Sequence, residues 1–266
     1  MKLRKGKTSD KTDTRQLSSD GHMTLIEHLN ELRSRLLKCV LAVVAGLIFA
    51  FIVYNPVLDF LRGPYRDLCE AKASLKCDGN LLNPDPIGGF GTRVRLSGYM
   101  GIGLALPVLM WQVWRFIAPG LLAKEKKYAI PFIMSSMVLF ASGALVAWLT
   151  LPKALEWLTA YAGSGTNPQF FIDKYVGFVL LLMIGFGAGF QFPVILVTLE
   201  LLGVVTPQTL LKSWRTVVVV IVIVAAVATP GGDPFSMLGL GVPLVLFYFI
   251  AVGIGFLFKR KKPVES

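Results

Sequence analysis

Six long apolar runs, separated by polar segments, dominate the pattern of the chain. They cover residues 36–53, 96–114, 129–151, 175–199, 216–229 and 237–258. Five of these runs approach or exceed the roughly 20 residues with which a helix crosses a hydrocarbon core of about 30 Å. Backbone amides in lipid must be satisfied within their own segment, which favours helices. The pattern therefore predicts an all-α polytopic membrane protein with six transmembrane helices.

The fifth run is shorter than the others. Residues 216–228 would rise only about 20 Å as a helix, which is too little for an average bilayer. Either the lipid thins around this run or its polar flanks lie deeper than usual. A strand is not favoured, because an isolated strand in lipid leaves its backbone unpaired.

The polar segments divide the rest of the chain. Residues 1–22 are basic and poor in apolar groups, which predicts a disordered tail. No apolar stretch follows until Leu36 and no small-residue cleavage site ends that stretch, so a cleavable signal is not predicted. The membrane domain is predicted to cover residues 23–258, and residues 259–266 form a basic tail. The segment 55–95 is too long for a bare turn and is predicted to be a folded outer cap with some helix.

Composition and charge agree with a membrane protein and give it an orientation. Apolar residues make up 54% of the 266, more than a soluble core of this length uses. With six spans both termini share a side, and that side carries 19 of the 27 Lys and Arg residues. Both termini are therefore predicted to be cytoplasmic. The net charge of +11 reflects this bias and attraction to anionic lipid, since no aromatic and basic platform for nucleic acid accompanies it.

The sequence lacks the usual signs of catalysis. Its two histidines, His22 and His28, both precede the first span, and no His or Cys group has metal-ligand spacing. The spans contain no His and no pair of acids that would activate a nucleophile, and there is no P-loop. We predict no enzyme activity, no metal and no cofactor.

Two cysteines lie in the outer segment. Cys69 and Cys77 fall on the predicted oxidising side of the membrane, so a disulfide between them is plausible. The alternative is two free thiols.

Two polar positions stand out against this apolar background. Glu31 lies among basic residues just ahead of the first span, where an acid is expected to meet a cation, either a neighbour or one brought by a partner. Gln191 lies within the fourth run, next to the kink expected at Pro193. Polar groups in lipid tend to face a protein interior or a wet cavity, so Gln191 either meets a partner or forms a hydrogen bond between helices.

Four segments, in order along the six spans, resemble one family. They are HLNELRSRLL, PVLMWQVWRFIAPGLLAKEKKY, FGAGFQFPV and TPGGDPFSM, and together they resemble TatC, the polytopic subunit of the twin-arginine protein translocase. The resemblance covers nearly the whole chain after Met23. It implies a concave, glove-like arrangement of six helices, with both termini cytoplasmic and with short fifth and sixth helices.

The resemblance also implies a signal-peptide site at the cytoplasmic face. Glu31 and Glu125 match the family's two signal-contacting acids, and Arg guanidinium groups pair bidentately with carboxylates. The alternative is solvated local ion pairs, worth under about 1 kcal/mol. Further positions expected around the site are Leu32, Arg33, Phe116, Leu121 and Lys124. Of these, Phe116 and Leu121 match an apolar rim, although Phe116 also fits ordinary anchoring at the membrane interface.

Other family positions have different implied roles. Many members have a glutamate where this chain has Gln191, and single-span subunits of the TatA and TatB type are expected to pack near it, along the fourth and fifth helices. Pro64 and Asp233 match positions in the outer loops and are expected to be structural. Self-association is also expected.

The function implied is the recognition of twin-arginine signal peptides of folded precursors and the nucleation of translocon assembly in the cell membrane. Export would be driven by the proton-motive force. The competing interpretation is a stand-alone channel or secondary transporter for a small solute, which predicts solute flux by the purified protein in liposomes. A third is a structural scaffold without a ligand.

Overall fold

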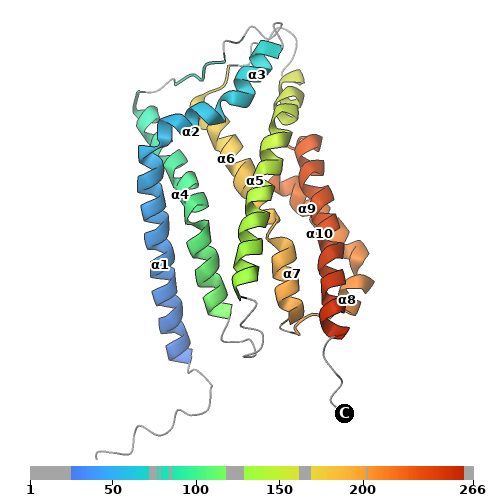
Figure 1. Cartoon of the computed structure of the whole chain (residues 1–266). Helices are drawn as coiled ribbons and strands as arrows, with labels where there is room; N and C mark the ends of the chain where they lie inside the picture. Colours follow the sequence, from blue (N-terminus) through green and yellow to red (C-terminus); the bar gives the residue numbers. More distant parts are fainter. Residues whose placement is uncertain are drawn as a thin grey trace, which may run out of the picture.

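A computed structural model describes residues 25–71, 77, 79–83, 86–117, 129–161, 169–201 and 203–260. Within these ranges the chain forms long helices that run side by side, with two short helices lying across one end (Figure 1). The helices are α1 (Leu25–Ile52), α2 (Tyr54–Leu61), α3 (Gly63–Ala71), α4 (Pro86–Ile117), α5 (Ala129–Ala160), α6 (Ile172–Gly189), α7 (Phe192–Leu201), α8 (Pro207–Lys212), α9 (Trp214–Ala228) and α10 (Pro234–Arg260).

The prediction of an all-helical polytopic membrane protein is confirmed. Among the described residues, five stretches are long and apolar enough to cross a membrane: Asn30–Ile52, Gly89–Arg115, Ile130–Ala160, Ile172–Leu201 and Pro234–Leu257. The fifth predicted span corresponds to α9, which has 15 residues and is the shorter apolar helix expected from the sequence. The start of α1 and the end of α10 lie at the same end of the molecule (Figure 1).

The expectation of a short sixth helix is wrong. Helix α10 has 27 residues, and its apolar stretch of 24 residues rises about 36 Å. Pro243 lies inside the helix without ending it. Proline in a membrane helix is tolerated because neighbouring groups satisfy the freed backbone. The length of α10 follows from the uninterrupted apolar run at residues 237–258 of the sequence.

The fourth span is broken where the sequence predicts a kink. Helix α6 ends at Gly189 and α7 begins at Phe192, so that Gln191 lies in the break and Pro193 is the second residue of α7. Proline has no backbone N–H to donate and fits the first turn of a helix, where that donor would be unpaired. The backbone N–H of Gln191 donates a 3.0 Å hydrogen bond to the carbonyl of Ala188, three residues earlier, whereas an α-helix uses a spacing of four.

Helix α6 forms the centre of the packed bundle. Val176, Val179, Leu182 and Phe186 of α6 are completely buried. The approach of α5 is close at Gly143, where an added Cβ would lie 2.6 Å from the backbone oxygen of Phe186. This close approach is the physical reason for a glycine at that position.

Two short helices, α2 and α3, lie in the segment predicted to be an outer cap. A disulfide joins Cys69 of α3 to Cys77. The Tyr175 hydroxyl of α6 donates a hydrogen bond of 2.9 Å to the carbonyl of Leu61, and the ring of Tyr65, which is fully buried, lies 5.7 Å from the Tyr175 ring. These contacts fasten the cap to the transmembrane bundle.

Helix α4 begins ten residues before the apolar run at 96, within the segment predicted to be outer loop. Hydropathy does not detect these residues because they include charged groups. One of these charged groups, Arg93, contacts α1. Its Nη2 donates a 2.9 Å hydrogen bond to the carbonyl of Phe51, and its guanidinium lies 4.4 Å from the centre of the Phe51 ring. A cation above an aromatic ring is stabilised electrostatically.

Candidate functional site

The start of α1 carries the acid singled out in the sequence. Glu31 forms an ion pair with Arg35 one turn later, in which Arg35 Nε donates to Glu31 Oε1 at 3.1 Å and Nη2 donates to the same oxygen. The Glu31 side chain is 24% exposed and that of Arg35 13%. Glutamate four residues before a basic residue is the favourable order on a helix. Leu32 and Arg33, between them, are exposed.

The packing of α1 on α4 determines where Glu31 lies along the axis of the helix bundle. The two helices meet at Gly46 and Gly101, where a Cβ added to Gly46 would lie 2.6 Å from the Gly101 oxygen. They run in opposite directions (Figure 1). Glu31 lies 15 residues before Gly46 and Phe116 lies 15 residues after Gly101, a rise of about 22 Å in each helix. Glu31 is therefore level with the end of α4.

Three of the predicted site residues, Leu121, Lys124 and Glu125, lie outside the described residues, and the structure does not describe the Phe116 side chain. The end of α4 and the start of α5, which flank this part of the chain, lie at the same end of the molecule as the start of α1 (Figure 1). The pairing of Glu31 with Glu125 in one site stays a prediction.

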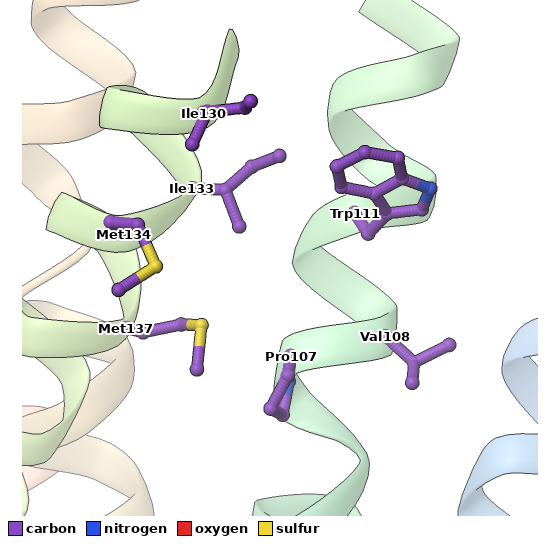
Figure 2. A pocket seen from close by; sticks show the side chains of 7 residues that line it. All are labelled: Pro107, Val108, Trp111, Ile130, Ile133, Met134 and Met137. Carbon is purple, nitrogen blue, oxygen red and sulfur yellow. The ribbon is translucent and has the colours of Figure 1, made fainter.

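An apolar groove of about 370 Å³ separates α4 from α5 near this end. Figure 2 shows that its lining comes from both helices, and it consists of Pro107, Val108, Trp111, Ile130, Ile133, Met134 and Met137. Its α4 residues precede Phe116 by five to nine positions, which places them about 8–14 Å further into the bundle. The sequence did not predict this groove, because it depends on the spacing of two helices.

Gln191 makes a hydrogen bond between helices. Its Nε2 donates to the carbonyl of Ser136 in α5 at 2.9 Å. Its Oε1 is buried and has no partner within the described part of the chain. Pro193 is buried beside it. The amide thus joins the α6–α7 break to α5, which is one of the two roles considered from the sequence.

Two further predicted positions lie at the opposite end. Asp233 is completely buried, and its Oδ1 accepts a 2.7 Å hydrogen bond from the backbone N–H of Ser236 in the first turn of α10. A side-chain oxygen at this position satisfies an amide that the helix leaves unpaired. Pro64 is buried in the first turn of α3. Both residues take part in local structure.

One ionisable residue was overlooked in the sequence. Glu200 follows the fourth apolar run directly, and both of its carboxyl oxygens are buried without a hydrogen-bond partner among the described residues. The position of this acid just after an apolar run could have drawn attention to it. Its burial could not be foreseen, because it depends on contact with α10. No group of three or more His, Cys, Asp or Glu side chains that could hold a metal is found in the described ranges.

These features define a polytopic α-helical membrane protein whose ionisable site lies at the end of the bundle where the chain enters the first span. The sequence model of the family described as Sec-independent protein translocase protein (TatC) matches residues 27–243. The chain belongs to the TatC family.

Relatives and a solved structure agree with this assignment. Sec-independent protein translocase protein TatC from Frankia casuarinae is 36% identical over 249 residues, covering 91% of this chain and 68% of the relative. The protein of the same name from Synechocystis sp. is 33% identical and covers 90% of each chain. A crystal structure described as twin arginine translocase receptor TatC superposes with a TM-score of 0.71 at 32% identity, covering 88% of this chain and 100% of the other.

The family assignment has direct consequences. The chain is a TatC subunit of the twin-arginine translocase, a non-enzymatic transport component with several membrane-spanning helices. Relatives occur in chloroplasts as well as in bacteria: the chloroplastic TATC of Arabidopsis thaliana is 36% identical and covers 88% of this chain and 66% of the relative.

Proposed function

We propose that this chain recognises the twin-arginine signal peptides of folded precursor proteins at the cytoplasmic face of the cell membrane. In this role it also nucleates the assembly of the translocon, and export is driven by the proton-motive force. The observation that carries the proposal is Glu31, an acid held on the first helix at the interface end of the bundle and paired with Arg35 of the same helix.

The Glu31–Arg35 pair suits exchange with an incoming guanidinium. Both partners lie on one helix, four residues apart, and such pairs contribute only about 0.3–0.5 kcal/mol. A signal-peptide arginine that forms a bidentate contact with the carboxylate replaces an interaction of low strength. Glu125, the second acid of the family pattern, would receive the other arginine.

The groove between α4 and α5 suits the apolar part of a signal peptide. It lies about 8–14 Å deeper than Glu31 and is lined by apolar side chains, of which Met134 is 54% exposed and Trp111 45% exposed. Methionine side chains adapt to partners of different shape. A peptide with its arginines at Glu31 would have its apolar residues at this depth.

The partners in this proposal are single-span subunits of the TatA and TatB type. They would pack along α7 and α9 near Gln191, and further copies of the chain would associate with it. The α9 face offers suitable surface, since Val219, Ile223 and Val227 are 57%, 56% and 82% exposed. No cofactor is required, because the proposed activity is binding.

The proposal is tested by the binding of a synthetic signal peptide with an Arg-Arg pair to the detergent-solubilised protein. We expect Glu31→Gln and Glu125→Gln each to weaken binding at least tenfold, which corresponds to about 1.4 kcal/mol. A Lys-Lys peptide should bind more weakly to the wild type, because an ammonium cannot form the bidentate contact.

Asp59→Asn is the matched control variant. Asp59 forms a comparable local ion pair with Arg62, but on α2 at the opposite end of the molecule, so its substitution should leave peptide affinity unchanged. If peptide affinity is indifferent to the Arg pair and to both glutamates, the proposal is wrong. Solute flux through the purified protein in liposomes would then be measured.

A further inference from the structure

The carboxyl group of Glu200 lies in an unusual environment for an acid. Both oxygens are covered by protein and accept no hydrogen bond from any described residue, although the residue as a whole is partly exposed. A buried polar group without a hydrogen bond is costly, and an ionised carboxylate is far more costly than a neutral one. The site therefore favours the protonated acid.

Helix α10 makes room for this carboxyl group at Gly255. A Cβ added to Gly255 would lie 2.5 Å from the Glu200 carboxyl carbon, so any side chain there would displace the acid. Two residues earlier, no described residue other than its own helix turn lies within 4 Å of a Cβ added to Gly253. The glycine at 255 is thus required by the acid on α7, whereas the glycine at 253 meets no described neighbour.

The neighbouring elements present few groups that could ionise near Glu200. On α10, the titratable residue Tyr248 lies seven residues before Gly255, and its hydroxyl donates a 2.6 Å hydrogen bond to the carbonyl of Leu210. Helix α5, which also contacts α7, has no titratable residue between Ile130 and Leu151. Lys212 on α8 is exposed.

Two basic residues, Lys259 and Arg260, end α10, and the structure does not describe their side chains. Lys259 follows Gly255 by four residues on α10, which places it on the same face of that helix one turn closer to the end. An ionised Glu200 paired with Lys259 is the outcome that opposes the proposal, and the experiment below separates the two.

We propose that Glu200 is a proton-binding site, which holds one proton as a neutral carboxylic acid while α7 packs on α10. The carboxylate takes up a proton from water when the two helices close and returns it to water when they separate. The proton is the only ligand, and no electron transfer is involved. This proposal is independent of signal-peptide recognition, because it concerns the purified subunit alone.

Infrared spectroscopy of the purified protein at about pH 7 tests the protonation directly. A protonated carboxyl has a carbonyl stretch that carboxylates lack and that shifts in heavy water. We expect this band in the wild type and its loss in Glu200→Gln. Gly255→Ala should weaken or shift the band, since the added methyl displaces the acid, whereas Gly253→Ala should leave it unchanged.

Thermal stability across pH gives an independent readout. Under this proposal the folded protein keeps a proton that the unfolded acid releases to water, so the wild type should lose stability relative to Glu200→Gln as the pH rises from about 5 to about 9. Lys259→Gln should not change this profile. Two results together would overturn the proposal in favour of an ion pair between Glu200 and Lys259. They are the absence of the infrared band in the wild type and equal destabilisation by Glu200→Gln and Lys259→Gln. If Glu200→Gln does not fold, the comparison of wild type, Gly255→Ala and Gly253→Ala decides the question.

Discussion

The contact between α1 and α4 depends on two glycines, and Gly101→Ala tests it. A Cβ at position 101 would lie 2.6 Å from the backbone nitrogen of Leu47 and 2.8 Å from its Cα. Both atoms belong to the α1 backbone, so no side-chain rotation relieves the overlap. Since ordinary contact begins at 3.4 Å, the helices must separate by about 0.8 Å locally. Helix α1 has α4 as its main neighbour, which makes this separation costly.

The expected loss of stability follows from overpacking. Inserting a methyl group into a packed contact costs about 1–3 kcal/mol, while replacing glycine by alanine in a helix favours folding by roughly 1 kcal/mol. Gly103→Ala on the same helix has the second effect alone, since no atom in the described part of the chain lies within 4 Å of its added Cβ. The difference between the two alanine variants therefore isolates the packing cost of about 1–3 kcal/mol.

Thermal unfolding of both variants in detergent or nanodiscs measures this difference. At about 2–4 °C per kcal/mol, Gly101→Ala should melt between about 2 and 12 °C below Gly103→Ala. Because Glu31 lies at the far end of α1, the same variant should also weaken binding of the Arg-Arg peptide. Equal melting temperatures for the two variants would refute the reasoning that backbone contact at Gly101 holds α1 in place.

Three further predictions concern other parts of the molecule. Replacing Cys69 and Cys77 by Ser removes a disulfide with a sequence separation of 8 and should cost about 2–3 kcal/mol; thermal unfolding without reductant should show the loss, and reductant should remove the difference from wild type. The double variant Met134→Gln, Met137→Gln keeps side-chain length but makes the groove polar, so it should weaken peptide binding in a titration, whereas the double leucine variant should bind normally. Gln191→Leu removes the hydrogen bond to α5 and should cost about 1 kcal/mol in thermal unfolding; co-purification with single-span subunits at the wild-type yield would remove the proposed partner role of this amide.

Much of the fold could be predicted from the sequence, because each apolar segment in lipid must satisfy its backbone hydrogen bonds within itself. A run such as 237–258 is helical in lipid whatever its neighbours, since its backbone has no other partner. The position of the kink at Pro193 also follows from local covalent structure, because proline removes a hydrogen bond from a helix interior. Pro243 removes one too and leaves α10 continuous, so the neighbouring groups decide whether the helix breaks. The extension of α4 to Pro86 was missed, since charged residues hide a helix that continues beyond the apolar run 96–114.

The candidate site was predictable only in part. Glu31 stood out because an acid next to a span is unusual, and its family match supplied a role. The groove between α4 and α5 could not be predicted, since it depends on the distance between two helices that lie side by side at one end of the bundle. The same holds for Glu200, whose burial requires Gly255 from a helix 55 residues later.

The sequence by itself determined which segments are apolar enough to cross the membrane, and it placed the acid Glu31 just ahead of the first of them. Hydropathy, charge and proline could determine this because each acts on the few residues around it. Tertiary structure decided which helices touch and at which residues. The close approach of Gly46 to Gly101 sets the height of Glu31, and the approach of α10 to α7 removes Glu200 from water. These outcomes depend on contacts between distant segments, and no local rule specifies such contacts.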